Sequence, residues 1–128
     1  MRILVVDDRG DNRMLVEDVV EQSGHTAVTA TNGQEAWELL DRGEKLDLII
    51  SDNDMPKMTG VELLRRMRAD ARTAGIPFIL MSGNRVVSDD DQTLLEDVCA
   101  RYGAMFLQKP FSVFRLMAMF GVGLEITT

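Results

Sequence analysis

Short apolar segments alternate with amphipathic segments along the 128-residue chain, and this alternation restricts the possible folds more than any other feature. Several apolar segments are continuous, as in ILVV and FILM, and lack the polar alternation of a strand with one face in water. A continuous run of this length is typical of a strand buried on both faces of a parallel sheet. We therefore expect strands at Ile3–Val6, Thr26–Ala30, Leu46–Ile50, Phe78–Met81 and Met105–Gln108.

The segments between the predicted strands carry helix signals. Asn32 and Thr59 are each followed three residues later by a glutamate, which is the spacing of a capping box at a helix N-terminus. Ser88 and the three aspartates after it are expected to begin the fourth helix, which runs toward Tyr102. Ser112 is expected to cap the last helix.

This order of elements predicts an α/β fold. Strands that are separated by helices run parallel, because each right-handed crossover returns the chain to the same edge of the sheet. Five such units predict a (βα)5 three-layer sandwich, with a five-stranded parallel sheet of the flavodoxin-like order 2-1-3-4-5. The length suggests a single domain over residues 1–128.

The composition excludes some kinds of partner. The 14 basic residues are outnumbered by 21 acidic ones, and a net charge of −7 argues against direct binding to nucleic acid or to an anionic membrane. No apolar run reaches the roughly 20 residues of a membrane span, and two acids follow the opening MRILVV too early for a signal peptide. Cys99 is the one cysteine, so we expect a packed thiol and a reducing, cytoplasmic location.

Four of the five predicted strands end beside residues that can handle a phosphoryl group. Asp7 and Asp8 follow the first strand, and Asp52 follows the third. Ser82 follows the fourth strand, and Lys109 follows the fifth. The carboxyl ends of parallel strands open on one crevice, so these side chains should converge there. Neighbouring carboxylates repel unless a cation lies between them, which predicts a hard divalent ion, Mg²⁺ or Mn²⁺, and phosphorylation of an aspartate.

The motifs at these strand ends resemble those of a known family. They are the acidic pair Asp7-Asp8, the stretch DLIISDNDMPKMTG around Asp52, the serine that closes FILMS, and the run Lys109-Pro110-Phe111. Together they resemble a response-regulator receiver domain of two-component signalling, of the chemotaxis-receiver type. The resemblance extends over nearly the whole chain.

By this resemblance, Asp52 accepts a phosphoryl group from a phosphohistidine on a sensor histidine kinase or a histidine phosphotransfer protein. The transfer would depend on Mg²⁺. Asp8 and Asp52 would ligate the metal directly, the backbone carbonyl of Asp54 would be a third ligand, and Asp7 would act through a water. Lys109 and Ser82 would hold the phosphoryl oxygens.

The resemblance also implies a switch. Ser82 would move onto the phosphoryl group, and Phe106 would swing inward into the space that this leaves. Asp54 and Asn84 lie at positions that the family varies to tune the lifetime of the phosphoryl group. Asp54 could disfavour an attacking hydroxide or a phosphatase's acidic side chain, or it could orient an attacking water, and the sequence leaves these alternatives open.

The implied output is a downstream protein that binds the face formed by the fourth helix, the fifth strand and the fifth helix. The final segment SVFRLMAMFGVGLEITT is apolar on too many sides for one buried stripe, which favours a partner, with a homodimer as the simplest version. The segment between Ser82 and Lys109 is longer than the family pattern predicts. We interpret its residues Asp89–Asp91 as a solvated first helical turn, with an acidic docking patch as the alternative.

We expect a switch protein that assists its own phosphorylation and dephosphorylation, not a turnover enzyme, and no output domain on this chain. One alternative is a receiver-like module that docks without being phosphorylated. The other is a phosphatase of the haloacid dehalogenase type, because Asp52-Asn53-Asp54 imitates its Asp-x-Asp motif. In that family the acceptor follows the first strand, whereas here the acidic pair comes first and no cap domain is present.

Overall fold

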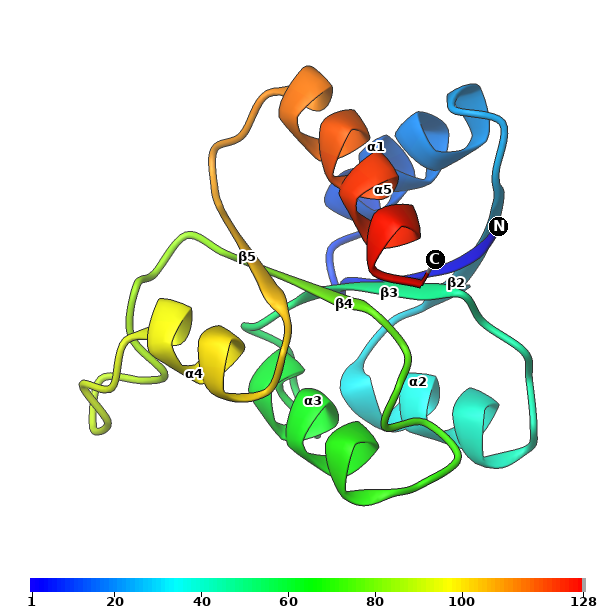
Figure 1. Cartoon of the computed structure of the whole chain (residues 1–128). Helices are drawn as coiled ribbons and strands as arrows, with labels where there is room; N and C mark the ends of the chain where they lie inside the picture. Colours follow the sequence, from blue (N-terminus) through cyan, green and yellow to red (C-terminus); the bar gives the residue numbers. More distant parts are fainter. Residues whose placement is uncertain (128) are drawn as a thin grey trace.

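Five strands and five helices alternate along the chain (Figure 1). The computed structural model describes the backbone of residues 1–127 and the side chains of residues 1–120. The strands are β1 (Arg2–Val6), β2 (Thr26–Ala30), β3 (Leu48–Asp52), β4 (Phe78–Ser82) and β5 (Met105–Gln108). The helices are α1 (Gly10–Gln22), α2 (Gly33–Asp41), α3 (Gly60–Ala69), α4 (Leu95–Arg101) and α5 (Val113–Thr127).

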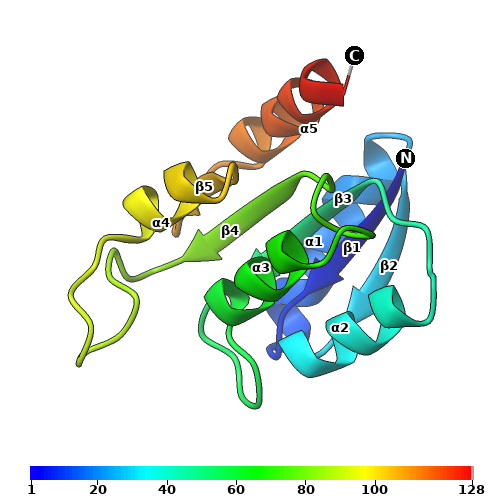
Figure 2. The same cartoon turned by 60° about the horizontal axis from the view of Figure 1, so that its bottom comes forward.

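The strands form one parallel sheet in the order β2-β1-β3-β4-β5, which confirms the predicted fold (Figure 2). All five predicted strands are present. β3 lies two residues later than expected and β4 extends one residue further, so that Asp52 and Ser82 are the last residues of their strands. This difference matters because it fixes both residues in the hydrogen-bonded ladder of the sheet.

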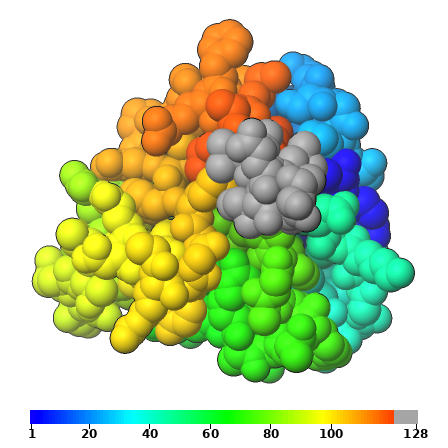
Figure 3. Space-filling model, viewed as in Figure 1, coloured from blue at the N-terminus to red at the C-terminus, as the bar shows by residue number. Residues whose placement is uncertain are grey.

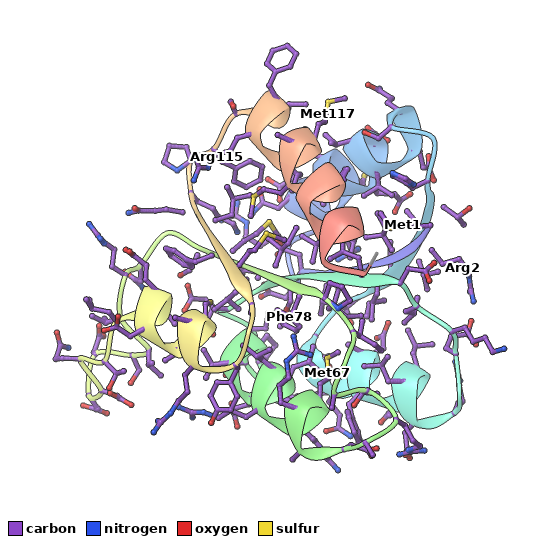
Figure 4. All side chains as sticks on the ribbon, in the orientation of Figure 1. Met1, Arg2, Met67, Phe78, Arg115 and Met117 are labelled. Carbon is purple, nitrogen blue, oxygen red and sulfur yellow. The ribbon has the colours of Figure 1, made fainter. Side chains whose placement is uncertain are left out.

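Helices cover both faces of the sheet. α1 and α5 lie on one face, and α2, α3 and α4 lie on the other (Figure 1). Each face has its own apolar core, and Figure 4 shows Met67 and Phe78 between the sheet and α3. Cys99 is buried in the same core, and burial raises the pKa of its thiol to about 11, as expected for a packed cysteine. Among the helices that the structure describes, none has the length and apolarity needed to cross a bilayer.

The predicted helix caps form with one difference. The hydroxyl of Thr59 accepts from the backbone N–H of Glu62 at 3.2 Å, and the Glu62 carboxylate accepts from the Thr59 N–H at 3.0 Å, which completes the capping box. Asn32 caps α2 by accepting from the N–H of Glu35 at 2.9 Å. The Glu35 carboxylate, however, accepts from the hydroxyl of Thr31 at 2.8 Å, so no reciprocal bond to the Asn32 backbone forms.

The prediction that a helix begins at Ser88 is wrong. Residues 85–95 form a hairpin closed by a bridge between Val86 and Leu94, and α4 begins only at Leu95. The hydroxyl of Ser88 accepts from the N–H of Asp91 at 3.1 Å, and the Asp91 carboxylate accepts from the N–H of Thr93 at 3.0 Å. Side-chain bonds of this kind compete with helix formation.

The three aspartates therefore lie in the turn of this hairpin and not in a first helical turn. Asp89, Asp90 and Asp91 are all exposed. The hairpin extends beyond the carboxyl end of β4 (Figure 2) and forms, together with α4, the lower-left lobe of the surface in Figure 3. The extra length of this segment is used for the hairpin, and α4 is only seven residues long.

Gly60, the first residue of α3, lies against the end of β3. A methyl group at this position would lie 2.5 Å from the carbonyl oxygen of Asp52 and 2.6 Å from Cδ1 of Leu80. Neither neighbour has room to move, because the Leu80 side chain is fully buried and the carbonyl belongs to the sheet. Only glycine therefore fits at this contact.

We expect Gly60→Ala to lower the free energy of unfolding by about 2 kcal/mol, because the added methyl overpacks the core. Gly75→Ala is the matched control, since a methyl there meets no atom within 4 Å and Gly75 has no positive φ. This control should change stability by less than about 0.5 kcal/mol. Urea denaturation of the two variants measures the difference, and equal stabilities would contradict the close contact.

Candidate functional site

The carboxyl ends of four strands bring the predicted site residues together at one edge of the sheet. Asp7 and Asp8 follow β1, Asp52 ends β3, Ser82 ends β4, and Lys109 follows β5. The backbone N–H of Lys109 donates to the carbonyl of Ser82 at 2.9 Å, which fixes the start of the lysine side chain beside β4. From there its ammonium reaches across to β3 and β1.

Lys109 contacts two of the three aspartates. Its Nζ lies 2.9 Å from Oδ1 of Asp52 and 3.7 Å from Oδ2 of Asp7. Asp7 is fully buried and Asp52 is 5% exposed, whereas Asp8 is exposed. One ammonium thus serves two buried carboxylates, and the third carboxylate lies at the entrance of the site.

The three carboxylates can share a cation. One oxygen from each of Asp7, Asp8 and Asp52 lies within 4.8 Å of the others. Oδ2 of Asp7 is buried without a hydrogen-bond partner, which is costly for a carboxylate oxygen. A set of carboxylate oxygens suits a hard cation such as Mg²⁺ or Mn²⁺. The residues present therefore fit a divalent ion at this position.

Burial raises the pKa of both inner carboxyl groups. For Asp52, burial acts against the hydrogen bond and the charge of Lys109, and the charges of Asp7 and Asp54 raise its pKa further. For Asp7, burial acts against the N–H of Arg9, which donates to Oδ1 at 3.0 Å, and against the charge of Lys109. A divalent cation between these groups would favour their ionised forms.

Ser82 and its neighbours are arranged differently from the carboxylates. The hydroxyl of Ser82 donates to Oδ2 of Asp54 at 3.4 Å and accepts from the backbone N–H of Asn84 at 3.0 Å. Asp54 and Asn84 are both exposed, and the contact of Asn84 with Ser82 is made by its backbone N–H. Phe106 is half-buried on β5 and precedes Lys109 in the sequence. Together with Cys99 it lines a cavity of about 360 Å³.

Two supporting residues were not predicted from the sequence. Asn53 is 1% exposed, and its Oδ1 accepts from the N–H of Val61 at 3.0 Å, which ties the loop after Asp52 to the start of α3. Arg13, one turn into α1, donates from Nη1 to the carbonyl of Asp7 at 2.8 Å. Asparagine after a strand and arginine on a helix are common, so neither residue carries a distinctive sequence signal.

Comparison with known proteins identifies the family. The model of the response regulator receiver domain matches residues 3–120. The chain belongs to the response-regulator receiver family. Its receiver motifs therefore come from common ancestry, and the haloacid dehalogenase alternative is wrong, since the strand order and the family match are both those of a receiver.

Relatives of this receiver domain include chemotaxis proteins and plant regulators. A chemotaxis protein CheY homolog of Campylobacter jejuni is 36% identical over 83 residues, and this match covers 64% of each chain. The match thus spans less than two thirds of that relative's length. A two-component response regulator of Arabidopsis thaliana is 32% identical over 124 residues, covering 88% of this chain and 78% of the relative.

Solved receiver structures share the fold. A response regulator receiver protein from Pseudomonas putida has a TM-score of 0.79 and 29% identity, and the match covers 94% of both chains. The chemotaxis response regulator of Vibrio cholerae also has a TM-score of 0.79, with 27% identity over 95% of this chain and 97% of that one. Both comparisons agree with the receiver fold described above.

We expect Asp7→Asn to raise the free energy of unfolding at pH 7 without divalent cations, because burial disfavours the ionised carboxylate. The folded state raises the pKa of Asp7 above its usual 3.8, so ionisation of this group destabilises the fold as the pH rises through the raised value. The gain should therefore vanish below pH 3.8, where the group is protonated in both states.

Asp8→Asn, at an exposed carboxylate, is the control and should show a smaller gain. Thermal unfolding in EDTA across this pH range measures both, and an unchanged stability of Asp7→Asn at pH 7 would contradict the electrostatic description.

Proposed function

We propose that the chain is a phosphorylation switch in which Asp52 accepts a phosphoryl group from the phosphohistidine of a sensor histidine kinase or a histidine phosphotransfer protein. The observation that carries this proposal is the pairing of Asp52 with the ammonium of Lys109 at 2.9 Å, with carboxylate oxygens of Asp7 and Asp8 within 4.8 Å of one of its own. The chain belongs to a family of two-component signalling modules, which supports the same conclusion.

In this reaction, a carboxylate oxygen of Asp52 forms a bond to phosphorus as the bond between phosphorus and the imidazole nitrogen breaks. The electron pair of the broken bond stays on the imidazole. Lys109 lies beside Asp52, so its ammonium would stabilise the negative charge of the phosphoryl oxygens as the phosphoryl group enters the site. The side chain of Asp52 is nearly buried, so the reacting group is held in one position and shielded from competing water.

The metal site belongs to the same proposal. Asp8 and Asp52 would bind Mg²⁺ or Mn²⁺ directly, the backbone carbonyl of Asp54 would be a third ligand, and Asp7 would act through a bound water. The cation supplies positive charge that offsets the carboxylates and the incoming phosphoryl oxygens. The structural feature that favours this assignment is the buried Oδ2 of Asp7, which accepts no hydrogen bond.

The signal would leave the site through Ser82 and Phe106. Ser82 would donate to a phosphoryl oxygen, and the ring of Phe106 would move inward, which biases a two-state equilibrium. The proposed output surface is the face of α4, β5 and α5, where Phe106, Cys99 and Arg115 line a cavity of about 360 Å³. A change in the position of Phe106 would alter the shape of this surface for a downstream protein.

The exposed Asp54 and Asn84 would tune the lifetime of the phosphoryl group. Residues 1–128 would act as one cytoplasmic receiver domain, and as a switch that assists its own modification without turning over a substrate. The alternative function is a receiver-like module that docks to its partner without phosphorylation.

Intact mass spectrometry after incubation with Mg²⁺ and acetyl phosphate should detect one added phosphoryl group, because Asp52 is positioned beside Lys109 and the carboxylate cluster. Asp52→Asn is the matched control and should gain none, since the amide is not a nucleophile. EDTA should abolish the adduct on the parent protein. An unmodified parent with every donor and with a cognate kinase would favour the docking module.

We also propose that α5 supports a homodimer. Phe114 is 81% exposed and Met117 is 39% exposed, and Figure 4 shows Met117 on the side of α5 that faces away from the sheet. Exposed apolar side chains that lie one turn apart on a helix can pack against a second copy of the same surface.

Sedimentation equilibrium at high protein concentration, with and without beryllofluoride as a phosphoryl mimic, should then detect a dimer. Met117→Glu should weaken it by at least about tenfold, because a charge would be buried at the interface. Met14→Glu is the matched control, since Met14 is 63% exposed but lies on α1. A parent protein that stays monomeric under both conditions would exclude the homodimer.

A further inference from the structure

The hydroxyl of Ser82 makes two hydrogen bonds to its neighbours. Ser82 is buried at the end of β4, and its Oγ accepts from the backbone N–H of Asn84 at 3.0 Å. The same oxygen donates to Oδ2 of Asp54 at 3.4 Å. Asp54 approaches from the loop after β3, so this contact links two neighbouring strand ends of the site.

A hydroxyl has only one proton to donate. The N–H of Asn84 occupies a lone pair of Ser82 Oγ, and the single proton of Ser82 forms the hydrogen bond to Asp54. Ser82 cannot donate to Asp54 and to a phosphoryl oxygen at the same time. The movement of Ser82 onto a phosphoryl group therefore requires that the bond to Asp54 breaks.

The charge of Asp54 acts in the same direction. The Asp54 carboxylate follows Asp52 by two residues, and its Oδ2 lies 3.4 Å from the hydroxyl of Ser82 at the edge of the same site. A phosphoryl group on Asp52 would bring more negative charge toward Asp54 and would be repelled by it. Asp54 thus favours the unphosphorylated arrangement twice, by holding the Ser82 proton and by its own charge.

We infer that Asp54 is a latch that holds Ser82 in the inactive arrangement, so that its side chain sets how readily this receiver switches on. The inference rests on the proposed phosphorylation of Asp52 and deepens it, because it assigns a restraint to one residue of the same site. Asp54 acts through Ser82 and is a positioning residue. Its side chain is exposed, so the restraint is weak enough for phosphorylation to release it.

Beryllofluoride binding tests the latch without any phosphodonor. At saturating Mg²⁺, Asp54→Ala should bind beryllofluoride about three- to tenfold more tightly than the parent, as expected for one lost hydrogen bond and one lost repulsive charge. Asp54→Asn keeps an acceptor for the Ser82 proton but loses the charge, so its affinity should lie between the two. Asp90→Ala, at an exposed position in the hairpin turn, removes the same charge far from Ser82 and should bind like the parent.

A double-mutant cycle separates the latch from simple repulsion. In a Ser82→Ala background, Asp54→Ala should tighten binding much less, because no proton remains to be released. In the free protein, the amide signal of Phe106 should shift toward its beryllofluoride-bound position in Asp54→Ala. The strand partner of Phe106 is Leu80, two ladder positions away from Ser82. A shift of its amide signal therefore reports the switch and not the substitution at Asp54.

The possible failures can be told apart. If beryllofluoride does not bind the parent at all, the proposed function fails. If it binds the parent and Asp54→Ala equally, or if the gain is as large in the Ser82→Ala background, the latch is wrong and the proposed function stands. A gain that depends on Ser82, together with the shift of Phe106, supports the latch.

Discussion

Two buried carboxylates that share one ammonium are the constraint on which the site depends. Asp7 and Asp52 are removed from water at the ends of adjacent strands, and Lys109 reaches both. One positive charge cannot fully compensate two negative ones at low dielectric, so both carboxyl groups keep raised pKa values. In the proposed function, a divalent cation would offset the negative charge that Lys109 leaves uncompensated.

The sheet holds this unfavourable cluster in place because its strands are fixed from both sides. Gly60 allows α3 to approach the end of β3, and Asn53 ties the intervening loop to that helix. A rigid frame of this kind holds Asp52 in place beside the side-chain contacts of the neighbouring strand ends. The bond between Ser82 and Asp54 is such a contact, and it lies two ladder positions from the pair of Leu80 with Phe106.

The sequence was sufficient for most of the fold because the signals are local. Short segments rich in apolar residues marked all five strands, several of them as continuous apolar runs, and Thr59 with Glu62 marked the start of α3. The exception was the segment after β4, where Ser88 and the aspartates had the composition of a helix start. The pairing of Val86 with Leu94 and the bonds to Ser88 and Asp91 favour a hairpin instead, and such pairing depends on residues that a helix signal does not include.

For the site, the sequence by itself determined which side chains meet. Asp7, Asp8 and Lys109 follow strands and Asp52 ends one. Parallel strands end at one edge of the sheet, so the convergence of these residues followed from topology. Only the tertiary structure decided how they are paired: which oxygen of Asp7 accepts no hydrogen bond, and that the hydroxyl of Ser82 donates to Asp54. These contacts join atoms from different strands over distances of a few ångströms. Burial and hydrogen-bond geometry at that scale are set by the packed fold, and no pattern along the chain records them.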